Sequence, residues 1–273
     1  MKEKIKINFT DWWGGFNKTD NYFYNLLIEE FDVIISDEPD FLFFSLFGNS
    51  HMKYNCKKIF YTGENVEPPL DYCDYSFSFD NINNSRNYRL PHYLLYDGYY
   101  DLINKRVSDD LLNRKFCNFV VTNPNCVDRN NFFRKLSKYK KVDSGGQYMN
   151  NIQMYVQNKR EFQSQYKFSI TFENNAYRPG YPWYITEKPF EAMCVNSIPI
   201  YKGGYEIKED FNTKSFINIH DFKSDEEAIE YIIELDRNDD KYMDMLRKPW
   251  FNDGIPENNK IENIKEFLYG IFK

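Results

Sequence analysis

The chain has 273 residues, which at roughly 100–200 residues per domain is enough for one large domain or two modest ones. It carries 35 Lys and Arg residues against 41 Asp and Glu residues, for a formal net charge of -6. This balance argues against nucleic acid as the main partner, because phosphate backbones attract basic surfaces, but it allows a local basic pocket for a small diphosphate.

Short apolar runs dominate the first part of the chain. Several of them are apolar throughout rather than alternating, which is typical of strands buried on both faces of a parallel sheet. Between the first two runs, Tyr22–Glu30 has Phe23, Leu26 and Leu27 at helical spacing, which indicates a βαβ unit. The predicted strands are Lys4–Phe9, Phe31–Ile35, Phe41–Phe47, Lys58–Thr62 and Tyr75–Phe79.

A loop-rich stretch from Asn81 to about Asn113 separates this part from a second alternation of strands and helices. Two such halves predict an α/β protein with two Rossmann-like domains facing a cleft, and ligands beyond the carboxyl ends of the strands. The strands predicted in the second half are Phe116–Thr122, Phe168–Phe172, Ser197–Tyr201 and Ser215–Ile219, and the helices are Arg129–Tyr139, Glu187–Val195 and Asp225–Leu235.

We place the predicted domains at residues 1–112 and 113–258, followed by a C-terminal segment at 259–273. This segment predicts a helix packed on the body of the protein. A membrane-surface helix is the alternative, which the acidic residues in the segment disfavour. The apolar positions at helical spacing are Ile261, Ile264, Phe267, Leu268 and Ile271.

The five cysteines are odd in number and form no CxxC pair, which argues against a zinc site or a full disulfide framework and fits a reducing compartment. His51, His92 and His220 match no metal spacing, so we interpret them as structural or surface residues. The N-terminus lacks the apolar core of a signal peptide, and no apolar run approaches the ~20 residues that span a bilayer. We therefore expect a soluble, cytoplasmic chain with no transmembrane segment, and peripheral membrane contact stays open.

Aromatic residues make up 19% of the chain. Sugar-stacking surfaces and interfaces use such side chains. A biased nucleotide composition is the alternative that we favour, because Phe, Tyr, Asn, Ile and Lys are all abundant together.

The most informative stretch is 166–204, where a predicted strand ends and polar residues follow at its carboxyl end. Thr186 then occupies an N-cap position, with Glu187 and Lys188 in the first helical turn. A helix N-terminus favours phosphate, Lys188 adds a full positive charge, and Glu187 can accept hydrogen bonds from ribose hydroxyls. An ordinary capped helix with solvated charges is the alternative.

Three segments of this stretch carry a family resemblance. The FEN segment at 172–174, the YITEK segment at 184–188 and the SIPIY strand at 197–201 resemble the donor-binding signature of the α-1,3/4-fucosyltransferases, which form glycosyltransferase family 10. The resemblance is to the soluble bacterial-type members. It implies that GDP-fucose binds at residues of the first two segments, with Glu173 supporting that wall. The implied donor-binding residues are Glu173, Asn174, Tyr184, Thr186, Glu187 and Lys188.

A second match is FVVTNPN at 119–125, followed by Arg129. It resembles the strand-to-helix segment of the family, in which an arginine reaches the donor phosphates. This implies donor contacts by Asn123 and Arg129, and arginine suits the role because it is always charged and can bind phosphate through two N–H groups. A surface arginine near a helix start is the alternative.

A third match is FYTGENVEPP at 60–69, which resembles the acceptor-side motif of the family. A glutamate before proline is the general base proposed there. Glu67 precedes Pro68 and is the implied base, and Glu64 is the alternative. Both carboxylates lie on a loop after a predicted strand.

The resemblance as a whole implies the GT-B fold, with the acceptor bound by the N-terminal domain and GDP-fucose by the C-terminal one. It implies an inverting α-1,3-fucosyltransferase in which Glu67, Arg129 and Lys188 are catalytic. The family default is an N-acetyllactosamine acceptor and a Lewis x-type product, in protein or lipopolysaccharide glycosylation. A chitobiose core or another surface glycan is an alternative acceptor. Transfer to O4 is the alternative to transfer to O3.

No Asp-x-Asp motif occurs, so we expect a metal-independent transferase with no bound metal and no cofactor other than its substrates. Two rival functions are another nucleotide-sugar-dependent transferase of the same fold and a non-catalytic glycan-binding relative. The loop Tyr177–Trp183 is longer than in the bacterial members, which leaves the contacts of Arg178 and Trp183 undetermined.

Overall fold

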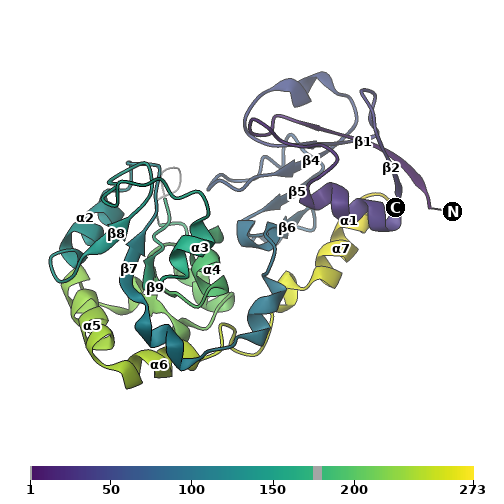
Figure 1. Ribbon diagram of the computed structural model, residues 1–273. Helices are drawn as coiled ribbons and strands as arrows, with labels where there is room; N and C mark the ends of the chain where they lie inside the picture. The colour runs from purple at the N-terminus through teal and green to yellow at the C-terminus, as the bar shows by residue number, and fades with distance from the viewer. Residues whose placement is uncertain (1, 175–179) are drawn as a thin grey trace. The chain divides into compact units, whose positions relative to one another are not determined.

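The computed structural model describes residues 2–174 and 180–273, which divide into two compact units (Figure 1). The first unit comprises Met1–Leu95 together with Glu257–Lys273, and the second comprises Tyr96–Pro256. Each unit contains one parallel β-sheet with helices packed around it. The predicted α/β architecture with two Rossmann-like halves is confirmed.

The first unit is built on a six-stranded sheet in the order β2-β1-β3-β4-β5-β6, with all neighbours parallel. The chain goes outward from β1 to β2 and then crosses back to β3, so the order reverses between β1 and β3. Ligands of such sheets bind at this reversal, beyond the carboxyl ends of the strands. The strands are β1 (Lys4–Thr10), β2 (Asp32–Ile35), β3 (Phe41–Phe44), β4 (Lys57–Tyr61), β5 (Tyr75–Ser78) and β6 (Asn87–Arg89).

Helix α1 (Tyr22–Glu30) begins where the sequence predicts, because Asn21 accepts a hydrogen bond from the backbone N–H of Tyr24 at 3.0 Å. Its apolar face buries Phe23, whose ring lies 5.2 Å from that of Phe43 and 5.1 Å from that of Phe77. Aromatic rings from the helix and the sheet therefore form the centre of this core.

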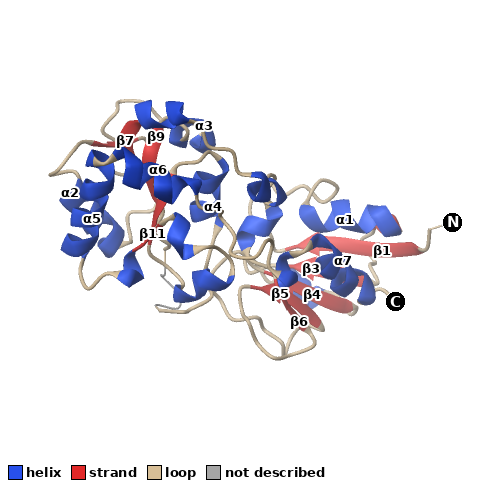
Figure 2. Cartoon of the chain, turned by 90° about the horizontal axis from the view of Figure 1, so that it is seen from below, coloured by secondary structure: helices blue, strands red, loops and turns tan. Residues whose placement is uncertain are grey.

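The last helix, α7 (Ile261–Gly270), packs beside α1 (Figures 1 and 2). The hydroxyl of Tyr269 donates to the carbonyl of Leu26 at 2.9 Å, and Lys265 pairs with Glu29 at 2.6 Å. Phe272 then places its ring 4.4 Å from that of Phe41. The C-terminal helix is thus part of the unit formed by the N-terminal residues. No helix in the described ranges is long and apolar enough to cross a membrane.

The second unit is built on a five-stranded parallel sheet in the order β11-β10-β9-β7-β8. Its order reverses between β7 and β9. The strands are β7 (Lys115–Phe119), β8 (Val142–Ser144), β9 (Tyr166–Ile170), β10 (Ile198–Tyr201) and β11 (Ile217–Asn218), and the helices are α2 (Val127–Leu136), α3 (Lys159–Gln163), α4 (Glu187–Cys194), α5 (Asp225–Arg237) and α6 (Asp239–Arg247).

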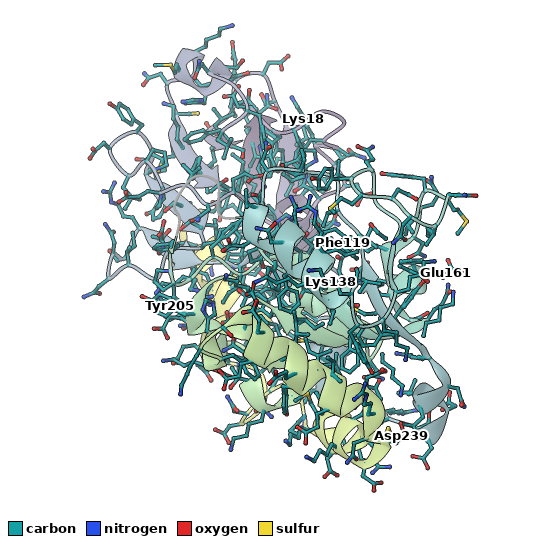
Figure 3. All side chains as sticks on the ribbon, turned by 90° about the vertical axis from the view of Figure 1, so that its left-hand side faces the viewer. Lys18, Phe119, Lys138, Glu161, Tyr205 and Asp239 are labelled. Carbon is teal, nitrogen blue, oxygen red and sulfur yellow. The ribbon has the colours of Figure 1, made fainter. Side chains whose placement is uncertain are left out.

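Phe119, labelled in Figure 3, joins sheet and helix in this unit. It ends β7 and stacks on Phe133 of α2, with 4.6 Å between the ring centroids. In the neighbouring strand β9, all side chains are buried. This strand is therefore buried on both faces although it contains Lys167 and Ser169.

Among the strands and α-helices in the described residues, four were not predicted: β6, β8, α3 and α6. The strands β6 and β8 have three residues each, too few to show a pattern. Helix α6 follows α5 without a loop, because Asn238 ends one helix and caps the next by accepting from the N–H of Lys241 at 3.0 Å. The predicted strands also run too far, since β7 ends at Phe119, β9 at Ile170 and β3 at Phe44.

Candidate active site

The loops that follow β7 and β9 leave the second sheet at its point of reversal. The first loop carries Asn123 and leads into α2 and Arg129, and the second carries Glu173 and Asn174. Four of the residues singled out from the sequence therefore emerge where parallel sheets bind ligands.

Glu173 is the centre of a buried polar cluster, with 3% of its surface exposed. Its carboxylate accepts hydrogen bonds from the backbone N–H of Thr186 at 2.7 Å, from the Thr186 hydroxyl at 2.6 Å and from the Lys188 ammonium at 2.9 Å. Three donors offset the cost of burying a carboxylate. Glu173 thereby ties the chain beyond β9 to the start of α4.

Lys188 has a second partner in the cluster, because its ammonium also donates to the Thr186 hydroxyl at 2.9 Å. An ammonium has three protons, so one remains for a ligand. Burial by itself would lower the pKa of Lys188, but the carboxylates of Glu173 and Glu187 outweigh it and raise the pKa above its usual value. Lys188 is therefore a permanent cation at neutral pH.

The N-terminus of α4 adds partial positive charge at the same place. Thr186 is the N-cap and accepts from the N–H of Lys188 at 3.5 Å, while Glu187 and Lys188 form the first turn. The capped helix predicted from the sequence is thus observed, and its cap residue also belongs to the Glu173 cluster. The first-turn N–H groups of such a helix favour an anion.

Arg129 is almost completely buried, with 2% of its surface exposed, although it lies in the first turn of α2. Its Nη2 donates to the carbonyl of Asn123, and its guanidinium carbon lies 5.9 Å from the ring centroid of Phe119. Its Nε has no hydrogen-bond partner within the described parts of the chain. Burial lowers the pKa of Arg129. A surface arginine would not be buried to this extent and would not have a buried Nε without a partner. The surface arginine considered as an alternative from the sequence is therefore excluded.

Several hydrogen bonds join the loops around these cations. The thiol of Cys126 donates to the carbonyl of Glu173 at 3.6 Å, and the N–H of Glu173 donates to the carbonyl of Lys202 at 2.8 Å. Lys202 in turn pairs with Asp128 at 2.9 Å. The loops after β7, β9 and β10 therefore form one connected structure at the carboxyl edge of the sheet.

Two glycine pairs make this close approach feasible. The sequence indicates a turn at Gly203 and Gly204 after a strand, but that signal is generic. A Cβ on Gly203 would lie 2.4 Å from the Glu173 side chain, and one on Gly204 would lie 2.4 Å from the carbonyl of Pro182. A Cβ on Gly146, after β8, would lie 2.1 Å from the carbonyl of Val121. The signal for them is a glycine pair that begins within two residues of the end of a strand.

We expect Gly146→Ala to destabilise the protein, because the new Cβ would meet the backbone of Val121 rather than a movable side chain. Overpacking of this kind costs ~1–3 kcal/mol, so the melting temperature should fall by several degrees. Gly270→Ala is the matched control. It lies at the end of α7 with no heavy atom within 4 Å of its new Cβ, so it should leave stability unchanged or raise it. Equal melting temperatures for the two variants would contradict the close approach at Gly146.

The acceptor-side segment lies in the first unit, on the loop after β4. The Glu67 side chain is exposed and that of Glu64 is half-buried. The start of the loop is held in place, since the N–H of Glu64 donates to the hydroxyl of Thr62 at 3.0 Å and its carbonyl accepts from the N–H of Val66 at 2.7 Å. Both carboxylates are thus presented by an anchored loop.

The histidines have structural partners, as expected. His92 pairs with the hydroxyl of Tyr61 at 2.8 Å, His51 with Asp11 at 2.7 Å, and His220 with the carbonyl of Gly203 at 2.9 Å. Among the residues that the structure describes, no group of three His, Cys, Asp or Glu side chains is arranged to hold a metal ion.

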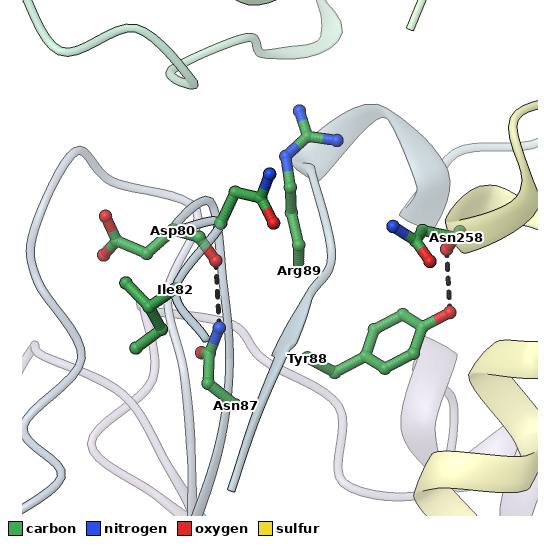
Figure 4. A pocket seen from close by; sticks show the side chains of 7 residues that line it. Asp80, Ile82, Asn87, Tyr88, Arg89 and Asn258 are labelled. Atoms are coloured by element: carbon green, nitrogen blue, oxygen red, sulfur yellow. Dashed lines mark hydrogen bonds between the residues drawn. The ribbon is translucent and has the colours of Figure 1, made fainter. Parts of the chain in front are cut away.

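A small cavity of about 140 Å³ lies in the first unit, at the carboxyl ends of β5 and β6 (Figure 4). Asp80, Asn87 and Arg89 line it, and the side-chain amide of Asn87 donates to the carbonyl of Asp80 at 2.9 Å. Tyr88 closes one side by donating to the carbonyl of Asn258 at 2.8 Å. The lining is mixed, because Ile82 and Tyr88 contribute apolar surface beside these polar groups.

The loop whose length stood out in the sequence is only partly described. Tyr177 and Arg178 lie outside the described residues, as does Asn175. Trp183 is half-buried and Tyr184 is buried, and the carbonyl of Tyr184 accepts from the N–H of Gly204 at 3.2 Å. Asn174, at the other end, is half-buried.

Comparison with known proteins relates both units to one family. The family model of the alpha-(1,3)-fucosyltransferase FucT N-terminal domain matches residues 7–96. The model of the glycosyltransferase family 10 (fucosyltransferase) C-terminal region matches residues 112–260, more than half of the chain. The matched regions contain all the segments that carried the resemblance, which lie at 60–69, 119–125, 172–174, 184–188 and 197–201.

Individual relatives agree with the family models. An alpha-(1,3)-fucosyltransferase from Helicobacter pylori is 35% identical over 291 residues, which cover 89% of this chain and 59% of that protein. Alpha-(1,3)-fucosyltransferase B from Drosophila melanogaster is 33% identical over 48% of this chain and 32% of its own length. The chain therefore spans less than two thirds of the length of these relatives.

A crystal structure of an alpha1,3-fucosyltransferase has the same fold, with a TM-score of 0.86, 31% identity, and coverage of 99% of this chain and 90% of that one. A crystal structure of alpha1,3-fucosyltransferase with GDP-fucose gives a TM-score of 0.85 at 31% identity, over 100% of this chain and 91% of that one. Two parallel-sheet units of the GT-B type are common to all three. The chain belongs to glycosyltransferase family 10, the fucosyltransferase family.

Proposed function

We propose that this chain transfers L-fucose from GDP-β-L-fucose to a hydroxyl of an N-acetylglucosamine-containing glycan, as an inverting α-1,3-fucosyltransferase. The observation that carries the proposal is the cluster of Glu173, Thr186 and Lys188 at the reversal point of the second sheet. It presents a cation and a helix N-terminus together, as a diphosphate requires. A similar protein whose structure is described with GDP-fucose supports the choice of donor.

In this proposal the second unit holds the donor. Lys188 and the N-terminus of α4 bind the diphosphate from one side, and Arg129 binds it from the first turn of α2. Glu187 accepts hydrogen bonds from the ribose hydroxyls. Glu173 keeps the Lys188 ammonium in place and neutralises part of its charge before the donor binds. The remaining donor contacts are assigned to Asn123, Asn174, Tyr184 and Thr186.

The chemistry proposed is a single displacement at the anomeric carbon. The acceptor hydroxyl gives its proton to the carboxylate of Glu67 as its oxygen bonds to the anomeric carbon. The bond from that carbon to the phosphate oxygen breaks on the opposite face, so the β-linked donor yields an α-linked product. GDP leaves with the bonding electron pair, and Arg129 and Lys188 stabilise the negative charge that develops on it.

The acceptor proposed is of the N-acetyllactosamine type, which gives a Lewis x-like product. Its support is the likeness of the 60–69 segment to the acceptor side of the family, together with relatives named as alpha-(1,3)-fucosyltransferases. Glu64 and Glu67 would both lie on the acceptor side, with Glu67 as the base.

The direct test is an assay of product formation with labelled nucleotide sugars. GDP-fucose should be used in preference to GDP-mannose and UDP-galactose, with N-acetyllactosamine, chitobiose and lactose offered as acceptors. Linkage analysis of the product should place fucose on O3 of N-acetylglucosamine. Preference for another donor would indicate that the chain is a transferase of the same fold that uses a different nucleotide sugar. Glycan binding without turnover of any donor would indicate a non-catalytic role.

We expect activity to survive chelation. Two cations, Arg129 and Lys188, and a helix N-terminus already offset the charge of the leaving diphosphate, and the chain has no Asp-x-Asp motif. Turnover in excess EDTA should remain a large fraction of the untreated rate. Complete loss that a single divalent ion restores would contradict the mechanism. Mild stimulation by added metal would not, because free cations can assist GDP release.

A further inference from the structure

Two aromatic side chains in the first unit are exposed side by side. Trp13 is 43% exposed and Phe47 is 51% exposed, and their rings meet edge to face with 6.4 Å between centroids. They lie on the loops after β1 and β3, the two strands between which the order of the first sheet reverses. Paired exposed rings at a sheet's ligand-binding edge point to an interaction site.

Trp13 rests on half-buried aromatic neighbours. Trp13 packs on Phe16 at 5.5 Å, and Phe16 stacks on Trp12 at 4.3 Å. Trp12 in turn stacks on Tyr61 at 5.6 Å and donates its indole N–H to the carbonyl of Phe43 at 3.4 Å. The exposed pair is therefore the outer layer of a packed cluster, which reduces the conformational entropy that it would lose on binding.

Asp11 joins the loop after β1 to the loop after β3 through hydrogen bonds. Its carboxylate accepts from the N–H groups of Ser50 at 2.9 Å and His51 at 2.8 Å, and its carbonyl accepts from the N–H of Phe47 at 3.0 Å. Burial opposes its charge, but the backbone N–H groups of His51 and Ser50 keep the pKa of Asp11 below its usual value. Asp11 adopts a φ of 59°, in the left-handed region that aspartate tolerates better than most residues. A strained, charge-stabilised residue thus fixes the position of the two rings.

Strand register places this pair beside the acceptor-side loop. Thr10 of β1 pairs with Phe44 of β3, and Phe44 pairs with Phe60 of β4. Trp13 and Phe47 follow their strands by three residues, and the loop with Glu64 and Glu67 follows β4 directly. Because the strands are parallel, these loops are neighbours on one sheet edge, and the stacking of Trp12 on Tyr61 connects them.

We propose that Trp13 and Phe47 form a stacking platform for a pyranose ring of the acceptor glycan, one that sets acceptor affinity and not donor affinity. The proposal rests on the proposed function. A pyranose presents an apolar face of C–H groups the size of one or two aromatic rings, and its hydroxyls point outward to polar partners. The two ring planes are 87° apart, so a pyranose can stack on the face of one ring while the other ring borders it. Polar groups of Ser50, His51 and Asp11 belong to the same two loops. A protein partner would need a far larger apolar area.

The test is a kinetic comparison of Trp13→Ala, Phe47→Ala and the double variant with N-acetyllactosamine as the acceptor. Each single change should raise the acceptor KM about three- to tenfold, the range for loss of one aromatic contact, and the double variant should raise it further. The donor KM and the slow hydrolysis of GDP-fucose without acceptor should stay at wild-type values. Trp13→Phe should recover part of the acceptor affinity, because it restores a ring.

Ile28→Ala is the matched control. Ile28 is a similarly exposed apolar residue, on α1, and its carbonyl accepts from Lys2 at the amino end of β1, the opposite edge of the same sheet. It should leave every kinetic constant unchanged. Wild-type acceptor KM in the double variant would overturn the platform. A parallel rise in donor KM would also overturn it, since that would indicate general damage.

A binding measurement separates the platform from the proposed function. Saturation-transfer NMR with N-acetyllactosamine should show contacts to the sugar ring protons in the wild type and their loss in the double variant. If no nucleotide sugar is turned over but this difference is observed, the transferase proposal fails and the platform stands. If the wild type transfers fucose but the variants bind and react normally, the platform alone fails. If the wild type neither binds nor fucosylates the disaccharide, the platform as a site for this glycan is wrong.

Discussion

Glu67→Gln should lose ~10²-fold or more of its transfer rate while it binds GDP-fucose nearly as well as the wild type. Glutamine keeps the shape and most of the hydrogen-bonding capacity of glutamate, but it cannot take up a proton at neutral pH. Removal of a general base typically costs ~10²–10⁴-fold. Glu67 is exposed on its loop, so the substitution should not disturb the fold.

Glu64→Gln is the matched control on the same loop and should cost much less. Donor affinity should be measured on both variants by calorimetry, and transfer by release of GDP in the presence of acceptor. If Glu64→Gln is inactive and Glu67→Gln is active, the base is Glu64 and the alignment of the loop is out of register. If both variants remain active, the base lies elsewhere and the acceptor-side assignment is wrong.

Arg129→Ala and Lys188→Ala should both weaken GDP binding and also slow transfer. Each removes a cation that meets more negative charge in the transition state than in the ground state. A charge-assisted hydrogen bond is worth about 1.5–3 kcal/mol, so kcat/KM should fall between tenfold and over a hundredfold. Arg134→Ala is the control for Arg129→Ala, because Arg134 lies on the same helix but is exposed and bonded to Asn131.

Lys188→Ala needs a second variant, because it also leaves the buried carboxylate of Glu173 without its cation. Breaking a buried ion pair in this way is strongly destabilising. The double variant with Lys188→Ala and Glu173→Gln removes that carboxylate charge, so it should recover melting temperature but not GDP affinity. Wild-type affinity for GDP in both Arg129→Ala and Lys188→Ala would overturn their assignment as phosphate ligands. Recovery of GDP affinity in the double variant would assign to Lys188 a purely structural role.

Local patterns were sufficient for the parts of this protein that depend on neighbouring residues. The apolar runs predicted β1, β4 and β5 to within a residue at their start, because each strand buries apolar side chains in the core, such as Ile7, Ile59 and Phe77. Helix α1 has the predicted bounds, and Thr186 caps α4 as expected. Each of these features depends on residues within a few positions of one another.

The ends of the strands could not be predicted, because pairing decides where they stop. Apolar residues continue beyond Phe119 and beyond Phe44, but they have left the sheet and belong to the site loops. Tertiary contacts likewise place α7 beside α1, more than two hundred residues away in the chain, through Tyr269 and Lys265. No local signal carries that information.

The same division applies to the candidate site. The sequence by itself determined the family and the cap at Thr186, because these are contiguous patterns. Only the tertiary structure decided that Glu173 binds Lys188, since their pairing depends on how the chain beyond β9 meets the start of α4. It also decided that Trp13 lies against Phe47, because that contact requires two parallel strands and the Asp11 hydrogen bonds between their loops. Long-range contacts of this kind form only when distant segments pack together, and no periodicity in the sequence encodes them.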